Sequence, residues 1–315
     1  MKRVNLWMLA LAAVIGFGLG AEARGGAAYW TSAGQVWKAN LEGSDAKALP
    51  LAFVNGMALD LAAGKMYMTG DLPLGAPGPT GRIWVADLEG GGQDTLMSLW
   101  SPPTSIALQP ARGKFPAMMY WTDSTSIEQA DVNGGGMLML VEGLPSPGGI
   151  SLDLAGGKMY WTRNYNDFGL PAVQRANLDG SKVEKLVNDM AGPTTGLALD
   201  LAAGKMYWGY VDPNIDGLFA GMIKRSNLDG SDIETIKSGL LAPTGLALDP
   251  IGKMLYWADT TLLYRGSLDG VDRDVIATGL SYPGGVAVDP TVPEPGMLWL
   301  GLGAIVLARR RRRGY

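Results

Sequence analysis

Residues 196–208 read GLALDLAAGKMYW, and residues 224–231 of the same unit read KRSNLDGS. Versions of these phrases return along the chain, most visibly as the pair Tyr-Trp. The pair stands at 29–30, 120–121, 160–161, 207–208 and 256–257, and a degenerate copy, Tyr-Met, stands at 67–68. The steps between the six tyrosines are 38, 53, 40, 47 and 49 residues. A repeat of this period is typical of an array of similar supersecondary units.

Each unit consists of short apolar or alternating runs bounded by Gly, Asp, Asn and Pro. Such runs favour β-strands joined by tight turns. The dipeptide Asp-Gly recurs at 179–180, 229–230 and 269–270, and it suits a hairpin turn that needs positive φ. Four antiparallel strands in a repeat of about 40–45 residues form a propeller blade. The sequence therefore predicts an all-β fold, a six-bladed β-propeller of four-stranded antiparallel blades.

The order of the phrases also predicts how the ring closes. The first repeat begins at its second strand, 27–31, and no Gly-x-Ala-x-Asp phrase precedes it. The missing phrase stands after the sixth repeat, at 284–289, as GGVAVD. We expect this last strand to complete blade 1, because closure removes the open sheet edges that invite aggregation. The expected blades are 27–50 with 284–290, then 55–98, 104–141, 147–187, 195–237 and 244–277.

Tyr120-Trp121-Thr122-Asp123 matches the YWTD motif outright, and the other phrases surround it in the expected order. Over roughly residues 27–290 the chain resembles the YWTD repeat propellers of low-density-lipoprotein-receptor type (class B repeats), which are six-bladed and bind other proteins. The resemblance implies that the motif Asp ties neighbouring blades together. Blade 6 keeps this residue as Asp259, whereas the remaining blades replace it, so looser junctions are expected at Ser32, Gly70, Arg163 and Tyr210.

The N-terminus has the pattern of a secretory signal peptide. Lys2 and Arg3 precede an apolar run at 6–19, and Ala21-Glu22-Ala23 gives signal peptidase a cleavage site after Ala23. The apolar run has 14 residues, fewer than the ~20 that a membrane-spanning helix requires. The expected domains are therefore a signal peptide (1–23), the propeller (24–290) and a C-terminal tail (291–315).

The C-terminal tail resembles the PEP-CTERM sorting signal of bacterial surface proteins. Pro293, Glu294 and Pro295 precede an apolar segment at 297–308 and five arginines at 309–313. The resemblance implies cleavage near Pro-Glu-Pro by an exosortase and a place at the outer surface or in the biofilm matrix, with a transient membrane contact by 297–308. The alternative is an ordinary tail anchor with its basic end inside. Twelve helical residues span only ~18 Å of a ~30 Å hydrocarbon core, which favours processing.

Charge and composition exclude several classes of function. The chain has 26 Lys and Arg and 30 Asp and Glu; without the two terminal signals, residues 24–295 carry 19 against 29. Such an acidic core repels phosphate backbones, so no nucleic-acid partner is expected. There is no Cys and no His, which excludes disulfides, Ser-His-Asp triads and His metal ligands. We expect no catalytic residues.

Two recurring sets of residues are interpreted as structural. Asp-ended inner strands recur in five blades, and the side chain of Asp caps a following turn; these acids are Asp60, Asp153, Asp200, Asp249 and Asp289. The Tyr-Trp pairs are read as core, because large rings fill the wedge between blades. The alternatives are a ring of channel acids that holds a divalent metal and a set of rings that stack on carbohydrate.

The insertions that break the repeat mark the predicted binding face. They follow the Tyr-Trp strand at 70–80, 163–171 and 209–221, and all three occupy the same inter-strand connection. The expected ligand contacts are Tyr165, Asn166, Asp167, Phe168, Tyr210 and Asp212. Asp212, Asn214 and Asp216 also have the oxygen spacing of a calcium loop, without its acidic last ligand. The same residues make an ordinary turn, so calcium is an open alternative to the absence of any cofactor.

The leading functional prediction is a secreted, surface-associated propeller that binds a protein or a matrix polysaccharide and is not an enzyme. The second prediction is a lactonase- or hydrolase-like enzyme with a divalent metal in the central channel. The loops that enter the inner strands read Pro-Thr-Ser at 103–105 and Pro-Thr-Gly at 243–245, with no acid at the channel mouth. The absence of acids in these loops disfavours the metal-dependent hydrolase.

Overall fold

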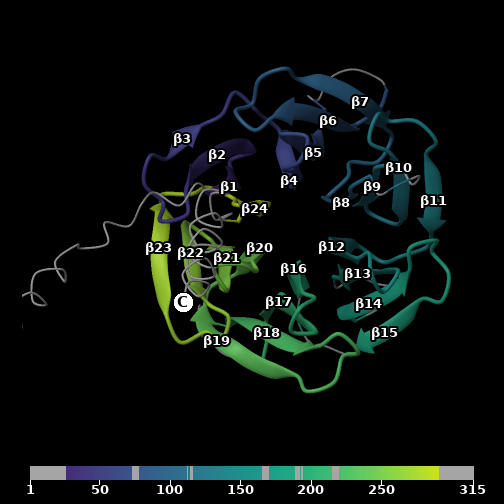
Figure 1. The fold of residues 1–315 in the computed structure, drawn as a ribbon. Helices are drawn as coiled ribbons and strands as arrows, with labels where there is room; N and C mark the ends of the chain where they lie inside the picture. Colours follow the sequence, from purple (N-terminus) through teal and green to yellow (C-terminus); the bar gives the residue numbers. More distant parts are fainter. Residues whose placement is uncertain are drawn as a thin grey trace, which may run out of the picture. The chain divides into compact units, whose positions relative to one another are not determined.

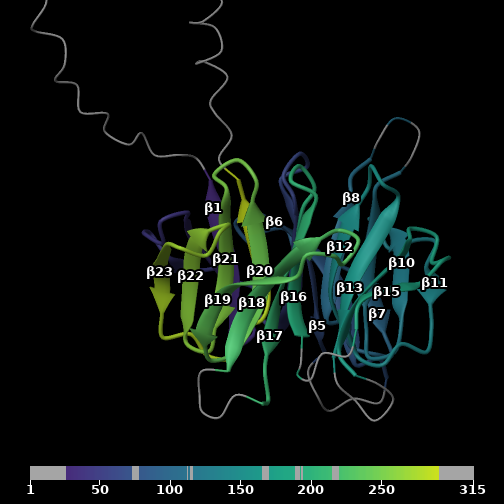
Figure 2. The same cartoon turned by 90° about the horizontal axis from the view of Figure 1, so that it is seen from below.

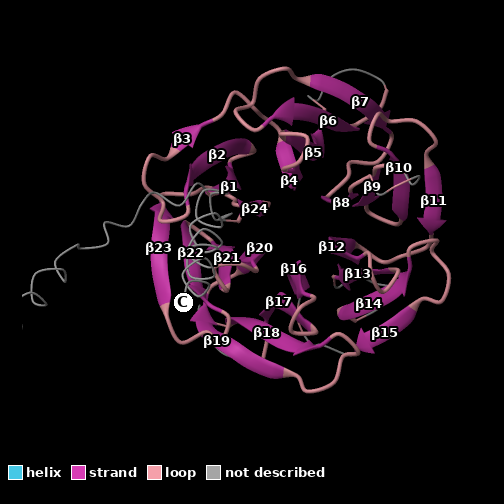
Figure 3. Ribbon diagram, viewed as in Figure 1, coloured by secondary structure: helices cyan, strands magenta, loops and turns pink. Residues whose placement is uncertain are grey.

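The computed structural model describes residues 26–72, 78–111, 113, 116–164, 170–188, 192, 194–214 and 220–290. These residues form six four-stranded antiparallel sheets around a central axis, with no helix among them (Figures 1 and 3). The described residues accordingly include no helix long and apolar enough to cross a membrane. The six-bladed propeller predicted from the sequence is confirmed. The processing sites at Ala23, Pro293, Glu294 and Pro295, and the apolar segment 297–308, lie outside the described residues.

The two inner positions of each blade hold the Gly-Leu-Ala-Leu-Asp and Tyr-Trp phrases. The innermost strands are β24 (Val286–Asp289), β4 (Val54–Asp60), β8 (Ser105–Gln109), β12 (Pro147–Asp153), β16 (Thr194–Asp200) and β20 (Pro243–Asp249). The second strands are β1 (Ala27–Ser32), β5 (Lys65–Asp71), β9 (Met118–Thr122), β13 (Lys158–Arg163), β17 (Lys205–Val211) and β21 (Met254–Asp259).

The two outer positions complete each sheet. The third strands are β2 (Gln35–Asn40), β6 (Gly81–Asp87), β10 (Ile127–Asp131), β14 (Ala172–Asn177), β18 (Gly221–Asn227) and β22 (Leu262–Ser267). The outermost strands are β3 (Lys47–Ala48), β7 (Asp94–Leu99), β11 (Leu138–Val141), β15 (Glu184–Val187), β19 (Glu234–Leu240) and β23 (Arg273–Thr278).

Each Tyr-Trp pair serves two junctions between blades. Adjacent residues of a strand point to opposite faces of its sheet, so Tyr120 packs with Trp161 of blade 4 while Trp121 packs with Tyr67 of blade 2. The same Tyr-to-Trp pairing fills the junctions from blade 4 to blade 1. Between blades 1 and 2, where the motif degenerates to Met68, the indole of Trp84 joins Tyr29 instead. The interpretation of these rings as core is confirmed.

The turn residues expected from the sequence also have the expected geometry. Asp60, Asp153, Asp200 and Asp249 each accept a hydrogen bond from a backbone N–H two or three residues further on. The turn glycines adopt positive φ, as at Gly180 (83°) and Gly230 (86°). A Cβ at Gly230 would lie 2.4 Å from the carbonyl oxygen of Leu186 in the preceding blade. This turn glycine therefore serves the contact between blades as well as the hairpin.

A second repeated contact joins the outer parts of neighbouring blades. Arg225 donates from Nη1 to the carbonyl oxygen of Leu268 in the next blade at 3.0 Å, and it pairs with Glu234 of its own blade at 2.8 Å. Arg175 and Arg265 make the same contact with the next blade at 3.2 and 3.0 Å. Each guanidinium thus donates a charge-assisted hydrogen bond to a carbonyl oxygen across a blade junction.

Strand β24 closes the ring as predicted. Blade 1 has the order β24-β1-β2-β3, with Ala27 opposite Asp289 and Trp30 opposite Val286. Val286 lies in the core between blades 6 and 1, and Ala287 lies in the core between blades 1 and 2. The last described strand therefore contributes to two junctions as well as to one sheet.

We expect deletion of residues 284–290 to lower the free energy of unfolding by more than about 3 kcal/mol, because it removes a ladder and two buried side chains at once. Chemical denaturation of the deletion variant and the full chain measures the difference. A chain shortened by deleting only residues 292–315 is the control and should retain the parent midpoint. An unchanged midpoint after deletion of 284–290 would contradict closure by β24.

Candidate functional site

Of the four connections within a blade that have eight or nine residues, three lie on one face of the ring, and the fourth, 110–117 between β8 and β9, lies on the opposite face. The second and third strands are joined by 72–80, 164–171 and 212–220 in blades 2, 4 and 5, but only by 33–34, 123–126 and 260–261 in the other blades. These connections share a face with those that run between blades, since neighbouring strands are antiparallel (Figure 2). We call this the insertion face, and the opposite one, with the Leu-Asp-Gly turns, the turn face.

Most of the predicted contact residues lie outside the part of the chain that the structure describes: Tyr165, Asn166, Asp167 and Phe168, together with Asp216 of the calcium pattern. Tyr210 is described and is only 4% exposed, packing with Tyr160 and Val173 between blades 4 and 5. Its burial disagrees with the expectation of a ligand contact. The sequence could not show this burial. Adjacent residues of a strand point to opposite faces of the sheet, so the direction of the Tyr210 ring depends on where the strand ends and the loop begins.

The described part of the calcium pattern has the hydrogen bonds of a turn. The carboxylate of Asp212 accepts from the backbone N–H of Asn214 at 3.0 Å and from its side-chain amide at 3.1 Å. The Asp212 N–H donates to the carbonyl oxygen of Ala220 across the base of the loop. This arrangement is that of an Asx-turn. Calcium binding stays a prediction.

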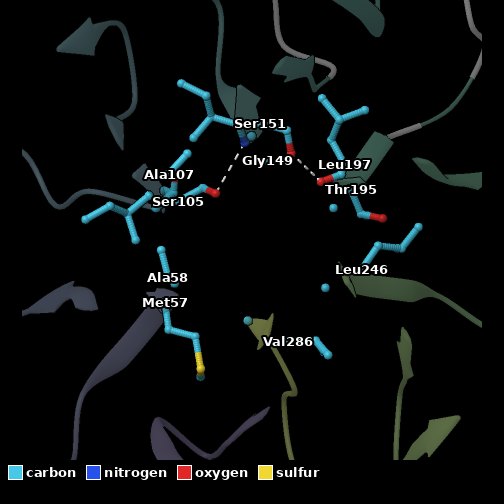
Figure 4. A pocket seen from close by; sticks show the side chains of 18 of the residues that line it. Met57, Ala58, Ser105, Ala107, Gly149, Ser151, Thr195, Leu197, Leu246 and Val286 are labelled. Carbon is cyan, nitrogen blue, oxygen red and sulfur yellow. Dashed lines mark hydrogen bonds between the residues drawn. The ribbon is translucent and has the colours of Figure 1, made fainter. Parts of the chain in front are cut away.

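The six innermost strands enclose a central channel of about 720 Å³ (Figure 4). Every described residue that lines it is uncharged, and glycines, small hydroxyl residues and aliphatic residues predominate. Four of the five recurring strand-end aspartates, Asp60, Asp153, Asp200 and Asp249, cap turns on the turn face. The lining therefore offers no carboxylate to hold a divalent metal, and the described residues contain no cluster of three acidic metal ligands.

The channel hydroxyls are engaged in contacts between blades. Ser151 donates to the carbonyl oxygen of Leu197 at 2.8 Å, and Ser105 accepts from the N–H of Ile150 (Figure 4). Thr195 donates to a carbonyl oxygen of the next blade at 2.7 Å. Among the described residues that line the channel, no acid or base adjoins these hydroxyls to activate them. The channel wall is thus built for ring closure rather than for nucleophilic chemistry.

Three large aromatic side chains stand exposed on consecutive blade junctions of the insertion face. Tyr282 lies between blades 6 and 1, Phe53 between blades 1 and 2, and Trp100 between blades 2 and 3, with 93%, 53% and 78% of their surface exposed. We call these three residues the aromatic arc. Exposed rings of this size are costly in water and favourable in a protein interface.

Two residues of the aromatic arc have a left-handed backbone. Phe53 has φ of 62° and Tyr282 has φ of 46°. That region costs a bulky residue about 1–2 kcal/mol relative to its usual backbone conformations, and glycine would occupy it freely. A large ring at such a position points to a role other than stability.

The arc is set on a fixed backbone. Arg82 donates to the carbonyl oxygen of Ala52, beside Phe53, at 3.1 Å. A Cβ at Gly70 would lie 1.7 Å from the carbonyl oxygen of Phe53, which explains why glycine replaces the motif Asp in blade 2. Thr80 donates to the carbonyl oxygen of Trp100 at 2.8 Å. A rigid support lowers the entropic cost of binding through these rings.

The backbone at Tyr282 is fixed by a hydrogen bond of the preceding residue, Ser281. The Ser281 N–H donates to Ser32 Oγ at 3.0 Å, at the position that the motif Asp occupies in other blades. Asp259 in blade 6 accepts from Leu241 and Ala242 N–H groups of the incoming linker in the same way. The junction between blades 6 and 1, which lacks the Asp, therefore has a substitute contact.

Sequence reasoning overlooked the aromatic arc because it examined only the insertions. The available signal was the linker between each outer strand and the next inner strand, where small residues and prolines predominate. Aromatic residues at 53, 100 and 282 depart from that composition. Their exposure could not be read from the sequence, since an aromatic residue is more often buried than exposed.

No family model matches the chain. It is 32% identical over 175 residues to a human low-density lipoprotein receptor-related protein 5-like protein, covering 52% of this chain and 63% of the relative. It is 39% identical over 69 residues to mouse Nidogen-2, covering 21% of this chain and 5% of the relative. The chain thus spans less than two thirds of the length of these relatives.

Solved structures share the fold at lower sequence identity. The crystal structure of a nidogen/laminin complex superposes with a TM-score of 0.71 and 23% identity, covering 85% of this chain and all of that one. TolB from Acinetobacter baumannii gives 0.62 and 15%, covering 84% of this chain and 66% of that one. The sequence relatives and the six blades together support a YWTD, low-density-lipoprotein-receptor class B type of propeller.

Blade 3 carries an unusual buried acid near the insertion face. Glu128 is buried opposite Trp121, where blade 4 has Gln174 opposite Trp161. Burial, and next the charge of Asp123, raise the pKa of Glu128 above its ordinary value of 4.5. An acid whose folded pKa is raised destabilises the fold once pH exceeds the unfolded pKa, because only the unfolded chain ionises freely.

We expect Glu128→Gln to be more stable than the parent at pH 8 and equal to it near pH 3, where the carboxyl is protonated in both the folded and the unfolded state. The gain should develop as pH rises from 4.5 through the raised folded pKa. Urea denaturation at several pH values measures it. The matched control Gln174→Glu should lose stability over the same range. Parallel pH profiles of parent and Glu128→Gln would contradict the prediction.

Proposed function

We propose that this chain is a non-catalytic, extracellular binding propeller whose insertion face docks a protein partner. The similarity to low-density lipoprotein receptor-related and nidogen proteins supports protein binding. A matrix polysaccharide is the alternative ligand, and a surface or biofilm location in a bacterium is part of the proposal. The observation that carries it is the aromatic arc of Phe53, Trp100 and Tyr282 on three consecutive junctions.

The charge around the arc suits a neutral partner surface. Arg82 lies 3.9 Å above the ring of Trp84, and its guanidinium also holds the Ala52 carbonyl. Arg163 donates to the carbonyl oxygen of Leu170. These cations are engaged within the propeller, so they offer little to an acidic polysaccharide. Apolar and hydrogen-bonding contacts would therefore dominate, with weak dependence on salt.

The position where the chain leaves the ring also supports the insertion face as the binding face. Ala27 pairs with Asp289, so the described chain begins and ends on the turn face. A tail processed or anchored beyond residue 291 would hold the turn face toward the cell surface. The insertion face, with the aromatic arc, would then face outward toward partners. A calcium loop at Asp212, Asn214 and Asp216 would lie on the same outward side.

We expect a Phe53→Gly, Trp100→Ser, Tyr282→Gly variant of the full chain to lose at least about tenfold in affinity for peptides selected against the parent from a displayed random library. Its melting temperature should stay equal or rise slightly, because glycine relieves the left-handed backbone at two positions. Isothermal titration and thermal melts measure the two effects.

The matched control is Ile251→Ser with Val271→Ser, two exposed apolar residues on the turn face. The control should bind the selected peptides as the parent does. Unchanged affinity in the arc variant, with loss in the control, would place the binding site on the turn face. If the parent protein binds neutral glycans but no peptide, the polysaccharide alternative is favoured.

We expect the mature chain to begin near Arg24 and to lack the arginines at 309–313 in a host that has an exosortase. The A-x-A site ending at Ala23 and the order Pro-Glu-Pro, apolar segment, arginine cluster motivate this expectation. Intact-mass measurement of surface-extracted protein decides it. A mass that still includes the five arginines would support a plain tail anchor.

A further inference from the structure

The wall of the central channel is built in layers, because the six innermost strands share one register against the motif tyrosines. The residue opposite the tyrosine is Ser151 in blade 4 and alanine in the other five blades. Two residues earlier stands Ser105 in blade 3, and glycine in the other five blades. Side chains of this size leave the middle of the channel open, and in these two layers only blades 3 and 4 contribute hydroxyls (Figure 4).

The polarity of the described lining changes along the channel axis. Each innermost strand begins on the insertion face and ends on the turn face. The lining at the insertion-face mouth includes uncharged polar side chains: Asn55, Thr104, Asn164, Thr195 and Thr244. The last lining residues toward the turn face are leucines: Leu108, Leu152, Leu199 and Leu201. The channel is therefore polar at one end and aliphatic at the other.

Charge disfavours ionised ligands in this channel. No described lining residue is charged, so an ionised group that enters would lose water without gaining a counter-charge. Beyond the leucines, the strand-end aspartates accept backbone hydrogen bonds in their turns, as Asp153 and Asp200 do. These carboxylates would repel an anion at the turn-face end. The lining thus selects an uncharged molecule.

Asn164 supplies an unsatisfied acceptor at the polar mouth. Its backbone N–H donates to the carbonyl oxygen of Ser146 at 3.0 Å, which fixes its position after β13. A Cβ on Gly148 of the inner strand would lie 3.4 Å from Nδ2 of Asn164, so the amide lies against the channel wall. The Oδ1 atom is buried, and no donor in the described structure reaches it. Native proteins leave few such acceptors unpaired, and the amide can turn Oδ1 toward a ligand without breaking a hydrogen bond of that atom.

We propose that the channel binds one uncharged amphiphile, a molecule with a medium-length aliphatic chain and a head that donates a hydrogen bond, such as a primary amide or an alcohol. The head lies at the insertion-face mouth and donates to Asn164 Oδ1. The chain follows the channel toward Leu199 and Leu201 at the turn-face end. This site is separate from the aromatic arc, and its ligand does not depend on a protein partner there.

The dimensions of the channel suit such a ligand. Its volume of about 720 Å³ lies within the roughly 300–1,000 Å³ of small-molecule sites in proteins. A strand rises about 3.3 Å per residue, so the innermost strand from Asn55 to Asp60 spans roughly 17 Å along the wall. An aliphatic chain within that length is removed from water over most of its surface, and this burial favours binding.

A matched pair of probes tests the charge of the ligand. Octanamide and octanoate have the same chain length and differ in the charge of the head. Isothermal titration of the full chain at pH 8 should show octanamide bound at least about tenfold more tightly than octanoate. Equal affinity for the two probes, or no binding of octanamide, would overturn the proposal.

The aromatic arc provides a control for the location of the site. The full chain with Phe53→Gly, Trp100→Ser and Tyr282→Gly should bind octanamide as the parent does, because none of the three residues lines the channel. This result would hold even if the arc binds no protein. Loss of octanamide binding in the arc variant would place the probe at the arc and overturn the channel site.

A channel-filling substitution tests the location directly. Ala107 lines the channel (Figure 4), and Ala107→Met fills part of it with a flexible side chain. This variant of the full chain should bind octanamide at least about tenfold more weakly. The matched control Ala46→Met, at an exposed position between β2 and β3, should bind it as the parent does. Thermal melts show whether both variants are folded, and equal octanamide affinity in two folded variants would overturn the proposal.

Asn164→Leu tests the contact with the head, and it gives a separate readout should Ala107→Met fail to fold. Leucine is close to asparagine in size and lacks the acceptor, so octanamide affinity should fall at least about fivefold. The control Asn133→Leu, at an exposed turn of blade 3, should leave the affinity at the parent value. Unchanged affinity in Asn164→Leu would overturn the proposed placement of the head.

Discussion

The fold depends on the division of each Tyr-Trp pair between two blade junctions. Because neighbouring residues of a strand point to opposite sides of the sheet, Tyr160 packs toward blade 5 while Trp161 packs toward blade 3. A blade therefore cannot bury its own rings, and each depends on both neighbours. This dependence requires the ring to close, and β24 satisfies it by completing blade 1 from the other end of the chain.

The two faces of the ring are under different constraints. On the turn face, the Leu-Asp-Gly turns receive arginine contacts from the preceding blade, and their glycines lie against its outer strand. The connections that carry these turns have five or six residues in every blade, whereas 110–117 between β8 and β9 shows that an insertion is tolerated elsewhere on this face. On the insertion face the connections vary from two residues at 33–34 to nine at 72–80. Freedom of length, rigid aromatic side chains and an uncharged channel mouth make that face the place where this propeller can acquire a ligand.

Most of the fold could be predicted from the sequence. The repeat period, the displaced phrase at 284–289 and the recurring aspartates predicted six blades, the closing strand and the turns, and each is present. The candidate site was predicted less well. The face was inferred from the positions of the insertions, but Tyr210 is buried and the aromatic arc was overlooked. Four other predicted contacts, residues 165–168, lie outside the described residues.

The difference has a physical reason. The same local sequence pattern occurs in each repeat unit. The sequence by itself therefore determined the strands, their order and the aromatic rings of the core. The exposure of Phe53, Trp100 and Tyr282 depends on the backbone conformation of linkers between blades, two of them left-handed, and on contacts with other blades such as that of Arg82 with the Ala52 carbonyl. Only the tertiary structure decided these features, because they arise between segments that no local pattern connects.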